Sequence, residues 1–342
     1  MGATANGPPI EQSVVSRRAF LRLGCGTLLS VVAAGVLAPV YATRLEPRWL
    51  QVTRRDILLP DLPEALEGFT VVQLSDFHLG PHVSAEDVRR SVRATNALEA
   101  DLIVLTGDFV YRSASYGVPC ARELASLRSR YGVCAVLGNH DIWTDPDAVA
   151  TSLTEAGIVV LRNERQALEV GGTRLWLLGI EDTGYTGFLG SPLGDFRAMW
   201  QKAAAALTHL LKGIPDAEPR LLLVHNPDFT EMLPEGRIDL GLCGHTHGGQ
   251  VRLPFIGAPV LPSCFGQKYT SGLVRGLRTL VYVNRGIGLI SPPVRLNCRP
   301  EITILSLWRS LSPSPSNLRL LVPRPAPTGT GPPSTEVVDA YP

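Results

Sequence analysis

The chain has 342 residues, of which 45% are hydrophobic and 18% are charged, and its formal net charge is +1. This balance is typical of a globular protein with a buried core, and it excludes a disordered, highly charged chain. The near-neutral charge also argues against a dedicated nucleic-acid-binding protein, because binding to the phosphate backbone needs a basic surface.

The first 42 residues have the pattern of an export signal. Residues 16–22 read SRRAFLR and precede an apolar stretch from about Leu23 to Val40. Paired arginines before a modest apolar segment resemble a twin-arginine signal, which the twin-arginine export machinery recognises. The alternative is that the arginines are only the positive flank of a general signal peptide or of a retained anchor. The segment is expected either to be cleaved after Ala42 or to be retained as an anchor. We expect an exported protein, in the periplasm or on the outer face of the cytoplasmic membrane, and membrane-associated if the anchor is retained.

The six cysteines are scattered along the chain, and none forms a CxxC pair. Cys134 and Cys243 lie inside apolar runs, where a free cysteine behaves as a small hydrophobic residue. Most cysteines are therefore predicted to be core residues, and the sequence leaves one disulfide open.

The C-terminal residues 310–342 are rich in proline, serine, glycine and threonine. A segment of this composition cannot bury enough apolar surface to become ordered. We therefore predict a flexible tail without chemistry and a working domain of residues 49–309, in which no internal repeat is visible.

Eight short apolar runs predict buried strands, with helical segments between several of them. Residues 84–98 begin with a capping box, Asp145 followed by Pro146 starts a second helix, and residues 195–212 form a third. Strands alternate with helices at first and dominate after residue 239, which indicates an α/β domain with more than one sheet. The predicted strands are 69–75, 101–107, 132–138, 174–180, 220–224, 239–244, 279–284 and 301–307.

Five of these predicted strands end in residues that bind metals or transfer protons. Because ligands of open α/β sheets bind beyond the carboxyl ends of the strands, these side chains are expected to converge on one crevice. His82 and His209 are left over and are expected in a loop and on a solvent-facing helix. The strand-end residues are Asp76, His78, Asp108, Asn139, His140, Asp141, His225, His245 and His247.

Two motifs carry most of the information, GNHD at 138–141 and GHTHGGQ at 244–250. A single DxH, or one aspartate after a strand, is usually a turn or cap residue. The ordered combination D-x-H, GD, GNHD, a lone H and GHTH is not explained by capping and core packing. It resembles the calcineurin-like metallophosphoesterase superfamily.

The resemblance covers about residues 50–307. DLGLCGHTHGGQVRLPFIG, YVNRGIGLISPPVRLNCRPEITIL and the export signal make the chain similar to the exported bacterial branch of that family. That branch contains phosphodiesterases and relatives that cleave UDP-2,3-diacylglucosamine. The implied fold is an α/β, four-layer metallophosphatase-type sandwich, with two mixed sheets packed face to face and helices outside.

By position, the resemblance also implies a ligand set for two divalent metal ions. His140 would lie off the metals, where it contacts the substrate or protonates the leaving group, with Asp141 orienting it or its turn. The alternative for His140 is a helix-capping role. One ion would be held by Asp76, His78, Asp108 and His247, and the second by Asp108, Asn139, His225 and His245, with Asp108 bridging.

The residue types support this set independently of the resemblance. Carboxylate, imidazole and amide oxygen without thiolate suit Mn²⁺, Fe²⁺ or Zn²⁺ and disfavour a closed structural zinc site. Two ions about 3.5–4 Å apart can clamp the attacking and leaving oxygens of an in-line displacement. The expected reaction is hydrolysis of a phosphodiester or pyrophosphate bond, by in-line attack of a hydroxide bridging the two metals. The alternative is an exported metal-binding or interaction protein of the same fold without turnover.

The substrate is less well determined. Residues 183–194 and 252–266 are apolar loops rich in glycine and proline beside the motifs. They are expected either to receive a lipid or a nucleotide sugar or to cover the core. Arg112 follows Asp108 where many relatives carry an acidic residue, and it is expected to contact a substrate phosphate or solvent. The expected partner is a phosphate-ester small molecule or a lipid-linked substrate.

Overall fold

The computed structural model describes residue 35 and residues 37–310. The paired arginines of the predicted export signal, most of its apolar stretch, Cys25 and the predicted tail after residue 310 lie outside the described residues. Within the described part of the chain, no helix combines the length and the apolar character needed to span a bilayer.

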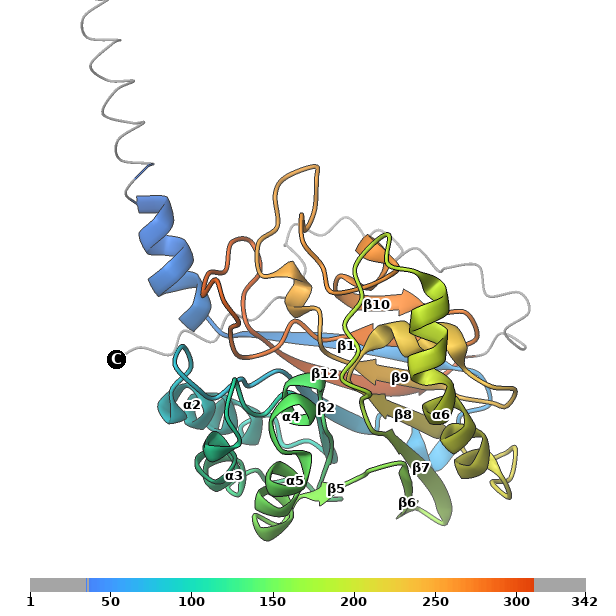
Figure 1. Cartoon of the computed structure of the whole chain (residues 1–342). Helices are drawn as coiled ribbons and strands as arrows, with labels where there is room; N and C mark the ends of the chain where they lie inside the picture. The colour runs from blue at the N-terminus through green and yellow to red at the C-terminus, as the bar shows by residue number, and fades with distance from the viewer. Residues whose placement is uncertain (1–34, 36, 311–342) are drawn as a thin grey trace, which may run out of the picture.

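Two six-stranded sheets form the centre of the molecule (Figure 1). In the first sheet, β12 pairs in parallel with β1 and antiparallel with β2, and the strands from β2 to β5 are parallel. The strand order is β1 (Gln51–Leu59), β12 (Glu301–Arg309), β2 (Thr70–Leu74), β3 (Leu102–Thr106), β4 (Val133–Val136) and β5 (Val159–Val160).

The second sheet is also mixed. Its outer pairs are antiparallel, whereas the strands between them are parallel. The strand order is β10 (Gly272–Arg275), β11 (Leu280–Val283), β9 (Leu240–Cys243), β8 (Arg220–Val224), β7 (Thr173–Ile180) and β6 (Glu164–Val170).

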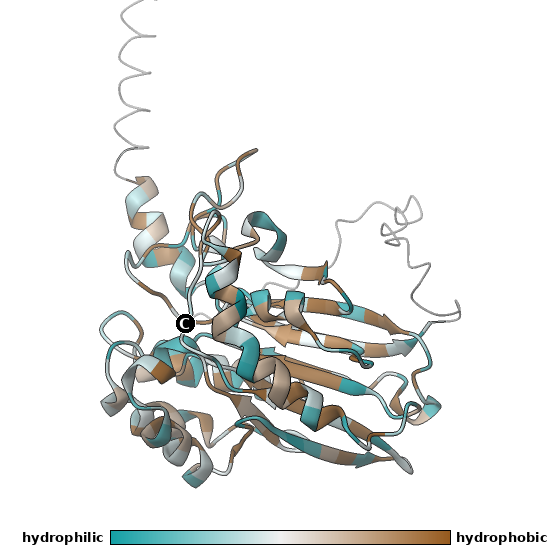
Figure 2. Cartoon of the chain, turned by 45° about the vertical axis from the view of Figure 1, so that its right-hand side comes forward, coloured by the Kyte–Doolittle hydropathy of each residue, from teal (hydrophilic) through white to brown (hydrophobic). Residues whose placement is uncertain are grey.

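The core lies on both faces of each central strand. Leu102 and Val104 of β3 enter the core between the sheets, whereas Ile103 and Leu105 face the helices. This follows from the alternation of side chains along a strand, and it explains why the strand sequences are continuous apolar runs. Figure 2 shows these hydrophobic strands between more hydrophilic helix surfaces.

Helices cover the outer faces of the sandwich. α2 (Ala85–Asn96), α3 (Gly117–Leu124) and α5 (Pro146–Glu155) pack on the first sheet, and α6 (Leu193–Leu211) packs on the second. The predicted capping box of α2 is present, and the Asp145 side chain caps α5. The expected fold class, two mixed sheets face to face with helices outside, is therefore confirmed.

The five cysteines among the described residues, Cys120, Cys134, Cys243, Cys264 and Cys298, are buried and free. This agrees with the prediction that most cysteines are core residues, and no disulfide joins these five.

Candidate metal centre

The predicted strand-end residues gather at one edge of the sandwich. The first sheet supplies its residues from the turns after β2, β3 and β4, and the second supplies its residues from the turns after β8 and β9. The two leftover histidines, His82 and His209, are exposed as expected. The structure buries all seven predicted ligands, which are Asp76, His78, Asp108, Asn139, His225, His245 and His247.

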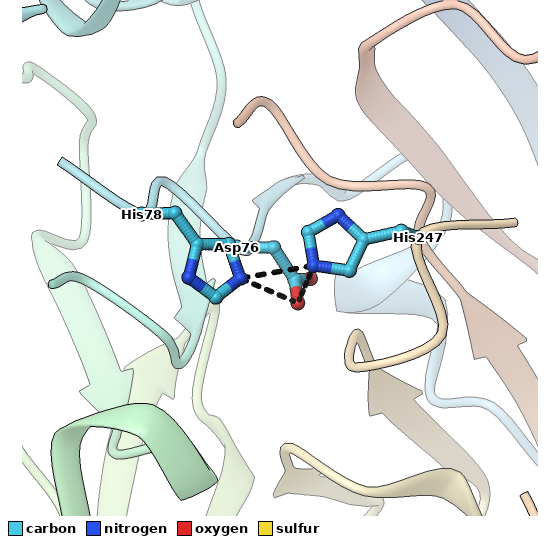
Figure 3. A group of neighbouring side chains, drawn as sticks. All are labelled: Asp76, His78 and His247. Carbon is cyan, nitrogen blue, oxygen red and sulfur yellow. Dashed lines mark hydrogen bonds and ion pairs between the residues drawn. The ribbon is translucent and has the colours of Figure 1, made fainter. Parts of the chain in front are cut away.

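One group consists of Asp76, His78 and His247 (Figure 3). The Nε2 atoms of His78 and His247 lie 2.9 Å apart, and Asp76 Oδ1 lies 3.3 Å from His247 Nε2 and 3.9 Å from His78 Nε2. Two imidazole nitrogens and a carboxylate oxygen that point at one place repel one another unless a cation or a shared proton lies between them. This geometry is typical of a metal site.

A second group adjoins the first through Asp108. Its Oδ2 atom lies 3.3 Å from His78 Nε2 and 3.1 Å from His225 Nε2, so one carboxylate oxygen faces histidines from both sheets. Asn139 Oδ1 lies 2.7 Å from His245 Nδ1. His245 Nε2 is buried without a hydrogen-bond partner, and His225 Nε2 has only the Asp108 carboxylate beside it. Because unpaired buried nitrogens are costly, these atoms fit a site for a cation.

The electrostatics favour the same interpretation. Burial lowers the pKa of His78 and of His245 to about 3, so both imidazoles are neutral and keep a free lone pair. Burial alone would raise the pKa of Asp108, but His225, His140 and His78 hold it well below its usual value. The same attraction to Asp108 outweighs burial at His225 and holds its pKa well above its usual value. Asp108 is thus an anion, and a cation would displace the His225 proton.

Backbone hydrogen bonds hold the ligands in place. The Asp141 carboxylate accepts from the N–H groups of Asp108, Phe109 and Gly138 at 2.9 Å and of Val110 at 3.2 Å. Asp141 therefore clamps the turn after β3 to the turn after β4, rather than orienting the ring of its neighbour.

Further hydrogen bonds hold two of the histidines in position. His225 Nδ1 lies 2.6 Å from the carbonyl oxygen of Thr106, to which it donates, so Nε2 is the nitrogen that faces the site. The backbone N–H of His140 donates to Asp108 Oδ1 at 2.8 Å. Sequence reasoning missed the role of Thr106, because a carbonyl oxygen leaves no residue-type signal.

Glycines allow the strand ends to approach one another closely. A Cβ atom on Gly138 would lie 2.6 Å from the Asp108 nitrogen, and one on Gly244 would lie 2.9 Å from the Ser75 Cβ atom. Asp76 and Asp108 themselves adopt positive φ angles of 52° and 57°. Such strained conformations persist where the surrounding structure imposes them, and they are common at functional sites.

His140 lines a cavity of about 550 Å³ next to these groups. Its half-buried ring lies 4.7 Å from the rings of His78 and Trp143 and 5.3 Å from the ring of Tyr111. Burial, together with His225 and Arg112, lowers its pKa despite the opposing effect of Asp108, so the ring is neutral. His140 also lies close enough to His78 and Asp108 to bind a metal ion together with them. That His140 contacts the substrate instead of a metal ion therefore stays a prediction.

Two further residues near the site were missed by sequence reasoning. Trp143 lines the cavity, and Asp182 is buried after β7 with its Oδ2 atom unpaired. Phe188, which also lines the cavity, comes from the loop at 183–194 that was expected to receive the substrate or cover the core. Burial raises the pKa of Asp182 to about 7. The sequence signal for Asp182 is an acidic residue two positions after the apolar run RLWLLGI, the same pattern that marks the other strand ends.

Comparison with known proteins gives consistent matches. The family model of calcineurin-like phosphoesterases matches residues 69–249. Metallophosphoesterase YkuE of Bacillus subtilis is 34% identical over 86% of this chain and 98% of its own length. Phosphodiesterase YaeI of Escherichia coli is 30% identical over 86% of this chain and 100% of its own length. UDP-2,3-diacylglucosamine pyrophosphatase LpxG of Chlamydia muridarum is 29% identical over 82% of this chain and 95% of its own length.

Proposed function

Because the chain belongs to the calcineurin-like phosphoesterase family and is a hydrolase of phosphate esters, we propose that it cleaves a phosphodiester or pyrophosphate bond at a two-metal centre. The observation that carries the proposal is the position of Asp108, whose single oxygen faces histidines from both sheets. The proposed ligands are Asp76, His78, Asp108 and His247 for one ion and Asp108, Asn139, His225 and His245 for the other.

The donor set fits divalent ions, since it combines two carboxylates, neutral imidazoles and one amide oxygen without a thiolate. When bound, two such ions would supply positive charge for the phosphoryl oxygens and acidify water so that it attacks near neutral pH. Mn²⁺, Fe²⁺ and Zn²⁺ all suit these donors. The chain's own part is to hold Asp108 anionic between the two groups and to fix the His225 ring through the carbonyl of Thr106.

His140 is proposed to act on the substrate. Its ring faces the cavity, and its backbone is tied to Asp108 Oδ1 at 2.8 Å. A neutral ring N–H at this place donates a hydrogen bond to a phosphoryl or leaving-group oxygen, which stabilises the charge that develops there. No serine or cysteine nucleophile is required for this chemistry.

The cavity supports a substrate with an apolar or sugar-nucleotide part. Its walls include Trp143, Phe188, Val260, Ile290 and Val294, while its polar end is formed by the metal-centre residues. The related LpxG is named for a pyrophosphate substrate that carries two acyl chains. We therefore propose a phosphate ester with an apolar group, such as a lipid-linked phosphate, as the substrate class.

The proposed place of action is outside the cytoplasm. The sequence of residues 1–42 supports export through the twin-arginine machinery, either with cleavage or with retention as an anchor. An envelope location would bring the enzyme to phosphate esters at the membrane surface.

Hydrolysis of bis-p-nitrophenyl phosphate by the full chain tests the proposal. We expect turnover that is abolished by a chelator and restored by Mn²⁺, because the reaction needs the ions as well as the chain. p-Nitrophenyl phosphate and a UDP-sugar, assayed in parallel, separate diester, monoester and pyrophosphate cleavage. Absence of metal-dependent turnover on all three substrates would favour the alternative, a metal-binding protein of this fold without activity.

A further inference from the structure

Two loops beside the cavity expose an apolar surface, here called the apolar rim. Phe255 is fully exposed and Leu189 is 78% exposed, although both are large hydrophobic residues. Residues 251–266 contain one charged residue, Arg252, and residues 183–194 contain none. Contiguous apolar surface of this kind marks an interaction site in soluble domains. The apolar rim consists of Phe188, Leu189, Leu253, Phe255, Ile256 and Val260.

The backbone presents the apolar rim in a defined shape. Leu253 and Gly257 pair across a tight turn through hydrogen bonds of 2.8 and 3.0 Å, and Phe255 at its tip has a φ angle of 65°. The Gln267 side chain accepts from the backbone N–H of Ala258 at 3.3 Å and so ties the turn to the domain. Phe255 is thus held outward by the fold.

The two loops form one surface. A Cβ atom built on Gly266 would lie 3.4 Å from the Leu189 side chain. The loop at 251–266 therefore packs directly against the loop at 183–194. Phe188 from one loop and Val260 from the other both line the cavity. The mouth of the cavity therefore opens within the apolar rim.

The N-terminal segment lies on the same side of the molecule. In Figures 1 and 2 the helical segment at 37–48 and the loop at 252–260 rise from the same end of the sandwich. Leu37 and Val40 of this helix are exposed, and the sequence that precedes it is apolar from Leu23. These apolar features share one side with the cavity mouth.

The N-terminal segment is fixed to the wall of the cavity. The backbone N–H of Arg295 donates to the carbonyl of Ala42 at 2.9 Å, and that of Cys298 donates to the buried Glu46 carboxylate. Val294, next to Arg295, lines the cavity. These hydrogen bonds fix the N-terminal segment next to the mouth of the cavity.

We propose that the apolar rim inserts into the surface of an anionic lipid bilayer, beside the N-terminal segment, so that the cavity mouth faces the lipid headgroups. A bilayer fits better than a protein, because the N-terminal segment exposes Leu37 and Val40 at the same end of the molecule as the apolar rim. The same helical segment carries exposed Arg44 and Arg48, and basic side chains beside an apolar surface attract anionic headgroups. This contact does not depend on the proposed reaction.

Fluorescence quenching in vesicles tests the contact with the full chain. The probe is Phe255→Trp, in equimolar phosphatidylcholine and phosphatidylglycerol vesicles whose acyl chains carry bromine. The matched control is Val118→Trp, which replaces an exposed residue on α3 at the end of the molecule away from the apolar rim. Quenching is measured as the increment over the parent chain, because five native tryptophans contribute.

We expect several-fold stronger quenching at position 255 than at position 118. Equal quenching at both positions would overturn the proposal, even if the N-terminal segment holds the chain on the vesicles. Quenching that is absent at 255 while the chain forms dimers in solution would assign the apolar rim to a second copy instead.

A second experiment tests whether the two loops of the apolar rim enter the bilayer together. Leu189→Trp reports the neighbouring loop, and Phe255→Asp with Ile256→Asp removes the apolar tip. We expect the acidic pair to abolish quenching at position 189, whereas Val118→Asp leaves it unchanged. Unchanged quenching at 189 in the acidic pair, with an unchanged thermal unfolding curve, would contradict insertion of the tip.

Discussion

Asp108 contacts the candidate metal ligands and His140, the proposed catalytic residue, through different atoms. Its Oδ2 atom faces His78 and His225, and its Oδ1 atom accepts the backbone N–H of His140. Its own backbone N–H donates to Asp141, which fixes the turn. The same carboxylate thus faces two predicted ligands and holds the backbone of His140.

His140→Ala is expected to lower kcat for bis-p-nitrophenyl phosphate by about 10²–10³-fold and to leave metal content unchanged. The ring faces the cavity, so its loss removes a donor to the substrate but no proposed ligand. Metal analysis and steady-state kinetics on the same preparation measure both effects. Loss of metal together with rate would place His140 among the ligands, which its distance to His78 and Asp108 permits.

At the scale of single elements, the buried strands were predictable and the edge strands were not. The eight predicted strands correspond to β2, β3, β4, β7, β8, β9, β11 and β12, and their apolar runs reflect burial on both faces. β1 was missed because its centre, TRRD, carries charged side chains on an exposed face. β6 and β10 were missed for the same reason, since they are also edge strands with partly exposed residues.

The turns after the strands show what sequence can and cannot reveal about the site. The gathering of the candidate ligands was predictable because each of them lies within a few residues of an apolar run. The clamp of Asp141 on the turn after β3 and the contact of Tyr111 with His140 depend on segments that meet only in the folded chain. Their residue types are compatible with many other roles, so no local pattern identifies them.

Gly138→Ala tests the close approach of the turns after β3 and β4. The new Cβ atom would lie 2.6 Å from the Asp108 nitrogen, so we expect a loss of about 1–3 kcal/mol in the free energy of unfolding and weaker Mn²⁺ binding. Gly194→Ala is the control, because the space around Gly194 in α6 is open. Denaturant unfolding compares the two variants. Equal stability and equal Mn²⁺ affinity would show that the turns tolerate a side chain.

At the scale of the whole molecule, the parallel central strands of both sheets end at the same edge. The Gln73 side chain of β2 donates to the carbonyl of Cys243 in β9 at 2.9 Å, which joins the two sheets just behind the site. The first sheet thus contributes Asp76 and Asp108, and the second contributes His225 and its neighbours. The candidate metal centre at this edge is thus built from both sheets.

The central claim is that residues from both sheets hold a pair of divalent ions around Asp108. The most direct test is the metal content of the full chain after loading with Mn²⁺ and removal of unbound metal. We predict about two ions per parent chain and well below one in Asp108→Asn, because this substitution removes the carboxylate that both ions share. Retention of about two ions by Asp108→Asn, or their absence from the parent chain, would contradict the account.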